Sequence, residues 1–306
     1  MMRRKLDPVW LNGQYSARGR IPEYSQTLLR WAHASAQARA ALSRRLDIRY
    51  GDGLNETLDV FPTHRRHAPV LVFLHGGLWR GLDKADHSFI APALVREGVS
   101  LVLPNYALCP AATIEQIVMQ SVRAVAWVSR NIDRLGGDPD RIYVVGHSAG
   151  GHLAAMMASC LWREANPELP PDPVRGALAI SGLFDLEAIR CTPFLQQDLG
   201  LTRATARKLS PYLFPPPRVP LLAVVGGQES DEYKRQSALI RSAWGAAAVP
   251  VYEVLPNAHH FDMLEELVRP GSRLHQLTLD LLHDRPVGPA RQPAETSAVR
   301  SRHAAL

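Results

Sequence analysis

The sequence predicts an α/β fold, with a mostly parallel central sheet and helices on both of its faces. Short apolar runs such as Val70–Leu74 recur along the chain, and unbroken runs of this length are typical of strands buried on both faces. Amphipathic stretches separate these runs, so strands and helices alternate, which favours a parallel sheet. Ahead of the first run, Arg45–Tyr50 and Thr57–Phe61 alternate around a Gly-Asp-Gly turn, which predicts a hairpin.

The remaining elements follow from the same patterns. An Ala-rich stretch predicts a helix over Pro22–Leu46, with Leu28, Leu29, Trp31 and Leu42 as its apolar positions. Later apolar runs predict strands at Val99–Leu103, Ile142–Val145, Ala177–Ile180, Pro220–Val225 and Val251–Leu255. The stretches between them predict helices at Asp86–Glu97, Ile114–Leu135, Ala149–Trp162, Tyr233–Trp244 and Met263–Leu267.

The 306 residues divide into a main domain over 46–284 and two terminal segments. Residues 1–45 are expected to form an N-terminal extension and a helix packed on the core. Residues 285–306 lack periodicity and are rich in Pro, Ala, Ser and Arg, which predicts a disordered basic tail. Within the main domain, residues 166–217 are expected to form a covering segment. It contains the Pro-rich stretches Asn166–Pro173 and Pro211–Pro220, and the second predicts a loop.

The composition excludes several classes of protein. Hydrophobic residues make up 46% and charged residues 21%, as in ordinary globular domains and unlike a disordered chain. No apolar run reaches the roughly 18–20 residues of a membrane span. The basic start is followed by Asp7 and Pro8 where a secretory signal needs an apolar core. The scattered Cys109, Cys160 and Cys191 form no disulfide framework, so we expect a reducing, cytoplasmic compartment and no membrane partner.

The net charge of +6 and pI of about 9.5 raise the question of a nucleic-acid partner. The surplus lies at the two ends of the chain. Arg3, Arg4 and Lys5 supply +3, and residues 285–306 supply another +3 from four arginines against one glutamate. The interval between them holds 28 basic and 28 acidic residues. Nothing in this count predicts a basic face on the folded domain, so no nucleic-acid partner is expected.

A candidate nucleophile lies between a strand and a helix. The predicted strand ending at Val145 runs directly into Gly146-His147-Ser148-Ala149-Gly150, and this G-x-S-x-G pattern presents a serine on a strained turn. A tight turn with an inert serine is the alternative, but the buried strand before it and the helix after it favour Ser148 as a nucleophile. His147 is expected to be a packing residue. No Walker loop, dinucleotide loop or metal-ligand spacing occurs, so no cofactor or metal is predicted.

A second glycine turn, His75-Gly76-Gly77-Leu78-Trp79, follows the first buried strand. Such a loop supplies backbone N–H groups to the oxyanion hole of hydrolases that use this type of serine turn. We therefore expect the N–H groups of Gly76 or Gly77 and of Leu78, together with that of Ala149, to hold the developing oxyanion. His75 is expected to brace the loop.

The acid and base should follow the serine in the order acid, then histidine. Histidine has a suitable pKa for taking the serine proton, and His259 and His260 follow the last predicted strand. Only one of them can face Ser148. The residues alone leave the carboxylate open among Glu229, Asp231, Glu232 and Asp185.

These motifs together resemble the α/β-hydrolase superfamily and, within it, the arylformamidase (kynurenine formamidase)-like group. The resemblance covers the chain up to about Asp284. The serine motif alone indicates only a hydrolase, whereas the His-Gly-Gly-x-Trp and His-Phe-Asp stretches narrow the choice to this group. The segments that carry it are Tyr15–Tyr24 with Arg30-Trp31, Leu58–Pro62, His75–Trp79, Gly146–Leu153, Ser181–Glu187, Arg235–Ser237 and His260–Leu267.

The resemblance implies an α/β-hydrolase fold with His260 as base and Glu229 as acid, in a pocket near Trp79, His147 and Phe261. It also implies a small-molecule acyl substrate, namely an aryl formamide such as N-formyl-kynurenine, and a homodimer. A carboxylesterase for short-chain or aryl esters is the alternative, followed by a non-catalytic binding module. This sequence departs from the group in having Glu229 where Asp is usual, and Leu78 where an aromatic residue is frequent, which alters a wall near the acyl site.

Overall fold

The central sheet has eight strands in the order β1-β2-β4-β3-β5-β6-β7-β8, in a computed structural model that describes residues 7–286. β2 pairs antiparallel with β1 and β4, and every other neighbouring pair is parallel. The predicted hairpin, the later strands and the mostly parallel sheet are confirmed. The strands are β1 Arg45–Arg49, β2 Thr57–Phe61, β3 Ala68–Leu74, β4 Ser100–Pro104, β5 Gly137–His147, β6 Val174–Ile180, β7 Leu221–Gly226 and β8 Val251–Leu255.

Both faces of the sheet are buried because successive side chains of a strand point to opposite sides. In β3, Val70, Val72 and Leu74 belong to one apolar cluster, whereas Leu71 and Phe73 belong to the other. These side chains are at most 1% exposed. The continuous apolar run in the sequence is therefore explained by a helical layer on each face.

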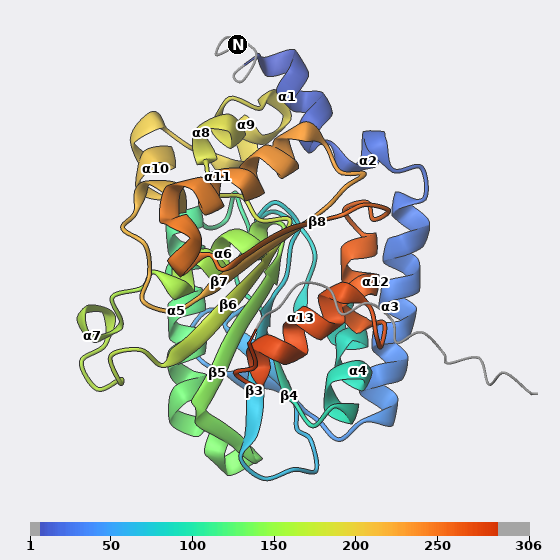
Figure 1. Ribbon diagram of the computed structural model, residues 1–306, viewed down its shortest axis with the longest axis vertical. Coiled ribbons are helices and arrows are strands. Elements are labelled where there is room, and N and C mark those ends of the chain that lie inside the picture. Colours follow the sequence, from blue (N-terminus) through green and yellow to red (C-terminus); the bar gives the residue numbers. More distant parts are fainter. Residues whose placement is uncertain (1–6, 287–306) are drawn as a thin grey trace, which may run out of the picture.

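Two sets of helices provide these layers (Figure 1). The first face is covered by α5 (Ile114–Asn131), α6 (Ala149–Ala158) and α11 (Asp231–Ala248). The second face is covered by α3 (Tyr24–Ala41), α4 (Ala91–Arg96), α12 (Asp262–Val268) and α13 (Arg273–Leu282). This arrangement confirms the prediction of helices on both faces. Shorter elements are α7 (Trp162–Ala165), η2 (Lys84–Ile90) and η3 (Ile132–Leu135).

Short helices from two distant parts of the chain gather at the carboxyl end of the sheet (Figure 1). α8 (Leu186–Arg190), α9 (Pro193–Leu199), α10 (Arg203–Lys208) and η4 (Pro211–Leu213) follow β6, and α1 (Pro8–Tyr15) and α2 (Ala17–Arg20) begin the described chain. α1 packs against both α9 and α11. The serine turn after β5 and the glycine turn after β3 open at this same end. There the chain's order of strands reverses, which is where ligands bind in open α/β sheets.

Several predicted boundaries differ from the structure. The helix predicted over Asp86–Glu97 begins as the 3₁₀ helix η2, and α4 starts only at Ala91 because Pro92 is tolerated only in a first helical turn. The helix predicted to reach Trp162 ends at Ala158, where the Ser159 hydroxyl donates back to Ala155 O.

The predictions of a loop at Pro211–Pro220 and of a covering segment over residues 166–217 are each wrong in part. The Pro211–Pro220 stretch, predicted as loop, contains the 3₁₀ turn η4. Residues 166–217 include β6, a strand inside the sheet, so the covering part begins after Ile180. α13 was not predicted, although Leu274, Leu277 and Leu281 recur at helical spacing and are buried. Most of the predicted tail lies outside the described residues. Among residues 7–286, no helix is both long and apolar enough to cross a membrane.

Candidate active site

Ser148 sits on a strained turn between β5 and α6. Its φ of 57° and ψ of −118° lie in a region that side chains rarely adopt. The turn is held by the Ser148 N–H, which donates to Ile180 O at 2.8 Å. A Cβ at Gly150 would collide with the carbonyl oxygen of Leu74, and one at Gly146 would collide with that of Gly150. The two glycines of the motif are therefore required by the close approach of backbone on either side of the serine.

His260 is held by a buried carboxylate. Its Nδ1 lies 2.6 Å from Oε2 of Glu229, whose side chain is fully buried. The other carboxylate oxygen, Oε1, accepts from the Ser181 hydroxyl at 2.5 Å and from the Gly226 N–H at 2.8 Å. The carboxylate is thus fixed by donors from β6 and β7 and in turn fixes the ring of His260. His260 and Ser148 line the same cavity.

The other candidate acids and the second histidine have different partners. Asp185 caps α8 and pairs with Arg235 at 3.0 Å. Glu232 is buried against the same arginine, whereas Asp231 is exposed and pairs with Lys234. His259 accepts the N–H of Asp262 on its own Nδ1. Of the residues left open by the sequence, Glu229 and His260 are the pair that the structure brings together.

The glycine turn after β3 lies directly against the serine. Gly76 is so close that a Cβ there would be 3.3 Å from Cβ of Ser148 and 3.0 Å from His147 O. Gly77 has a φ of 102° and Leu78 one of 52°. Among the described residues, no hydrogen bond uses the N–H of Gly77 or Leu78. The N–H of Ala149 begins α6 and so has no partner within that helix.

Two buried histidines, His147 and His75, support the site. Nε2 of His147 lies 2.9 Å from His260 O, and its ring packs 4.4 Å from the ring of His260. His75 stacks on Tyr106 with ring centroids 4.2 Å apart, and the Tyr106 hydroxyl donates to His75 O at 2.6 Å. Burial lowers the pKa of both His147 and His75, so the neutral form is favoured in each.

The cavity in front of Ser148 has a volume of about 610 Å³, within the range of small-molecule sites. His147 and Phe261 line it as predicted, but Trp79 does not. Trp79 is fully buried and its ring packs edge-on against His152. The backbone of Trp79 has a positive φ of 56°, and its ring belongs to the apolar core beneath the glycine turn. The prediction of Trp79 as a pocket residue is therefore wrong.

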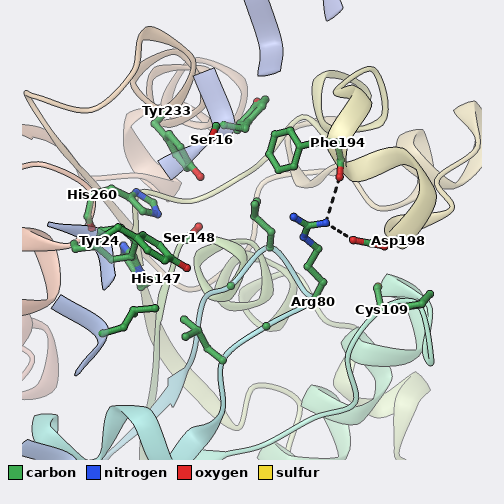
Figure 2. A pocket seen from close by; sticks show the side chains of 18 residues that line it. Ser16, Tyr24, Arg80, Cys109, His147, Ser148, Phe194, Asp198, Tyr233 and His260 are labelled. Carbon is green, nitrogen blue, oxygen red and sulfur yellow. Dashed lines mark hydrogen bonds and ion pairs between the residues drawn. The ribbon is translucent and has the colours of Figure 1, made fainter. Parts of the chain in front are cut away.

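Sequence reasoning missed several residues that line this cavity. Tyr233 lines the cavity beside Ser148, and its ring lies 4.5 Å from that of His260. Tyr24 packs edge-on against Phe261. Figure 2 shows Tyr233, Tyr24, Ser148 and His260 grouped together. The signal for Tyr233 was its place directly after the loop of Glu229. Tyr24 lies in the segment Tyr15–Tyr24 that carries the family resemblance, but nothing in that segment indicates that this side chain reaches the cavity from α3.

Two further buried histidines, His152 and His87, are each held by one ring nitrogen. A ring nitrogen of His152 bonds Leu209 O at 2.8 Å, and one of His87 bonds Asp83 O at 2.9 Å. Burial lowers the pKa of His87 to about 3 and that of His152 to about 4. Within residues 7–286, no group of three or more His, Cys, Asp or Glu side chains is arranged to hold a metal ion.

A parallel sheet with a strained serine between a central strand and its helix, and a histidine–carboxylate pair after later strands, defines the α/β-hydrolase class. A family model described as alpha/beta hydrolase fold matches residues 71–241. The chain is 31% identical to kynurenine formamidase of Salmo salar, over 80% of this chain and 84% of that protein. It is 33% identical to esterase LipQ of Mycobacterium tuberculosis, over 77% of this chain and 62% of that protein.

A crystal structure from Silicibacter, named as a thioesterase, superposes with a TM-score of 0.77 at 29% identity and covers 86% of this chain and 97% of that one. The chain therefore belongs to the α/β-hydrolase family, in the kynurenine formamidase-like group, and it is a hydrolase. The family resemblance and the fold predicted from the sequence are confirmed.

Proposed function

We propose that the protein is a serine hydrolase that removes the formyl group from aryl formamides such as N-formyl-kynurenine, giving formate and an aromatic amine. The observation that carries this proposal is the fixed His260–Glu229 pair beside the strained Ser148. The chain that holds this site is 31% identical to a kynurenine formamidase along most of its length.

The reaction follows from the roles that these groups can take. The Ser148 Oγ attacks the formyl carbon while His260 accepts the hydroxyl proton. The carbonyl oxygen becomes an oxyanion, held by the N–H groups of Ala149 and of the Gly76–Leu78 turn. His260 then gives its proton to the leaving nitrogen, so the C–N bond breaks and the amine departs. Water attacks the formyl-serine ester by the same route, releasing formate and restoring the Ser148 hydroxyl.

Glu229 supports this cycle through its contact with Nδ1 of His260. A carboxylate at that position keeps the proton on Nδ1, so that Nε2 is the nitrogen that accepts a proton from serine. It also stabilises the imidazolium that forms during the attack. Burial and the two donors on Oε1 keep the carboxylate from rotating away.

The direct test is the substitution Ser148→Ala, measured on N-formyl-kynurenine and on short 4-nitrophenyl esters. We expect activity on both substrate types to be abolished and covalent labelling by a fluorophosphonate probe to disappear. Full hydrolytic activity of the variant on any substrate of the wild type would contradict the assignment of the nucleophile. Failure of the wild type to react with the probe would favour a non-catalytic binding module.

A carboxylesterase for short-chain or aryl esters is the second candidate, supported by the 33% identity to esterase LipQ. The same three residues cleave esters and formamides. The ratio of kcat/KM on N-formyl-kynurenine to that on 4-nitrophenyl esters separates the two functions. A ratio that strongly favours esters would contradict the formamidase proposal.

We also propose that the enzyme works in the reducing environment of the cytoplasm, as a homodimer. Cys109, Cys160 and Cys191 are free thiols in the described chain, which is the expected state in that compartment. Light scattering of the purified protein measures the oligomeric state, and a monomer at micromolar concentration would contradict the dimer.

A further inference from the structure

The cavity ends in an ion pair that takes no part in the acyl chemistry. Arg80 follows the glycine turn after β3, and Asp198 lies on α9. Nη1 of Arg80 donates to Oδ2 of Asp198 and, at 3.2 Å, to Phe194 O. The guanidinium also lies 5.3 Å from the centre of the Phe194 ring. Figure 2 shows Ser148 and His260 at one end of the pocket and the Arg80–Asp198 pair at the other.

This pair is open to a ligand. The side chains of Arg80 and Asp198 are 32% and 35% exposed, and both line the cavity that contains Ser148. Among the residues that line it, they are the only guanidinium and the only carboxylate. The surroundings are otherwise apolar, aromatic or weakly polar, such as Leu78, Leu82 and Phe194. Opposite charges are therefore concentrated at one end of a site whose reacting serine lies at the other.

The unused atoms of the pair point to the kind of ligand. The bonds to Asp198 and Phe194 both use Nη1 of Arg80. Among the described residues, nothing bonds Nε or Nη2 of Arg80, or Oδ1 of Asp198. A free Nε–Nη2 edge matches the geometry of a carboxylate, and a free carboxylate oxygen accepts from an ammonium group.

The two charges side by side favour a zwitterion over a singly charged group. An anion alone on Arg80 would be repelled by Asp198, and a cation alone on Asp198 would be repelled by Arg80. An uncharged group would remove water from both charges without replacing its hydrogen bonds, which is unfavourable. An α-amino acid head has an ammonium and a carboxylate on one carbon, so it satisfies both partners.

We propose that Arg80 and Asp198 bind the α-amino acid head of the substrate, with its carboxylate on Arg80 and its ammonium on Asp198. This proposal rests on the proposed function. It narrows the substrate class to aryl formamides that carry an α-amino acid head with a free ammonium and a free carboxylate. In N-formyl-kynurenine, the amino acid head is joined to the ring through a ketone, away from the formamide. The aromatic ring would then lie between Ser148 and the ion pair.

The test compares two formamides that share the ring and the ketone. N-formyl-kynurenine carries the amino acid head and 2′-formamidoacetophenone does not. We expect Arg80→Gln to lower kcat/KM on the first by about 10- to 100-fold, as for loss of a charge-assisted carboxylate contact. Activity on the second should stay within about 3-fold. Arg30→Gln is the matched control, because Arg30 makes an exposed ion pair with Glu265 and should change neither substrate.

Asp198→Asn gives a readout of opposite sign. On 4-(2-formamidophenyl)-4-oxobutanoate, which keeps the carboxylate and lacks the ammonium, this variant should be faster than the wild type because the repulsion is removed. On N-formyl-kynurenine it should be slower. The proposal would be overturned if Arg80→Gln lowered kcat/KM equally on N-formyl-kynurenine and 2′-formamidoacetophenone, or changed it on neither.

A pair of esters tests the amino acid site independently of whether the enzyme is a formamidase. O-acetyl-L-tyrosine and 4-methylphenyl acetate share the acyl group and differ by the amino acid head of the leaving group. If the wild type cleaves esters and no formamide, the formamidase proposal fails. A preference for O-acetyl-L-tyrosine that Arg80→Gln removes still supports the amino acid site, and equal rates of the wild type on the two esters overturn it.

Discussion

Exchange of Glu229 for glutamine tests the acid of the site with an almost isosteric change. In the native protein Oε1 accepts from two donors, the Ser181 hydroxyl and the Gly226 N–H. The glutamine amide must therefore place its oxygen at that position, because an NH₂ group there would face two donors. Its NH₂ group then faces Nδ1 of His260, 2.6 Å away in the native structure.

This orientation forces the wrong tautomer of the histidine. With an amide donor opposite Nδ1, that nitrogen must act as an acceptor, and the ring proton moves to Nε2. His260 can then no longer take the proton of Ser148. Loss of the correct tautomer lowers kcat about 10⁴-fold in a Ser-His-Asp triad, equivalent to about 5 kcal/mol of transition-state stabilisation. We expect a loss of this size for Glu229→Gln, with KM little changed.

The assay is kcat and KM on N-formyl-kynurenine and on a 4-nitrophenyl ester, beside the unfolding midpoint in urea. Asp231→Asn is the control, because Asp231 is the first residue of α11, two positions after Glu229, and its carboxylate is 81% exposed and pairs with Lys234. It should keep activity within about 2-fold. If Glu229→Gln keeps more than about a tenth of the wild-type kcat, or if Asp185→Asn causes the larger loss, the tautomer argument is refuted.

Three further changes probe the site and its support. Tyr233→Phe removes a hydroxyl from the cavity that contains Ser148 and should lower kcat/KM by about 10-fold; an unchanged value would exclude that hydroxyl from the reaction. His152 has a pKa lowered to about 4 by burial, so the unfolded chain binds more protons below pH 6.5 and stability falls as the pH falls towards 4. The free energy of unfolding, measured in urea, should fall between pH 8 and pH 5 by about 2 kcal/mol less in His152→Gln than in the wild type. An equal fall in the two proteins would contradict this assignment. Gly150→Ala should cost about 3 kcal/mol or more in unfolding free energy, because its Cβ meets the Leu74 carbonyl, whereas Gly13→Ala, in open space, should cost nothing; equal stabilities would contradict the packing argument.

The parts of the fold that were predictable are those fixed by local sequence. The run Val70–Leu74 can be stable only between two apolar layers, and the serine motif needs a strand before it and a helix after it. Both patterns therefore indicated the sheet and the position of Ser148. By contrast, the short helices α8, α9 and α10 are only five to seven residues long, and helices of that length depend on tertiary contacts more than on their own periodicity.

The site divides in the same way. Ser148 and the Gly76–Leu78 turn were visible as motifs, but no pattern in the sequence separates Glu229 from Asp185, Asp231 and Glu232. That choice came from the family resemblance, and the structure agrees with it through the contact with His260. Burial decides which carboxylate can fix the ring, and burial of a loop residue depends on elements distant in the sequence.

The same division separates catalysis from substrate choice. Ser148 follows β5, Glu229 follows β7, His260 follows β8 and the glycine turn follows β3, so all of them are held by the central sheet. Arg80 leaves the glycine turn and pairs with Asp198 of α9, so the end of the cavity is closed by the covering helices. Tyr24 closes another side from α3. These walls come from segments outside the sheet. Family membership is therefore a better guide to the reaction type than to the identity of the substrate.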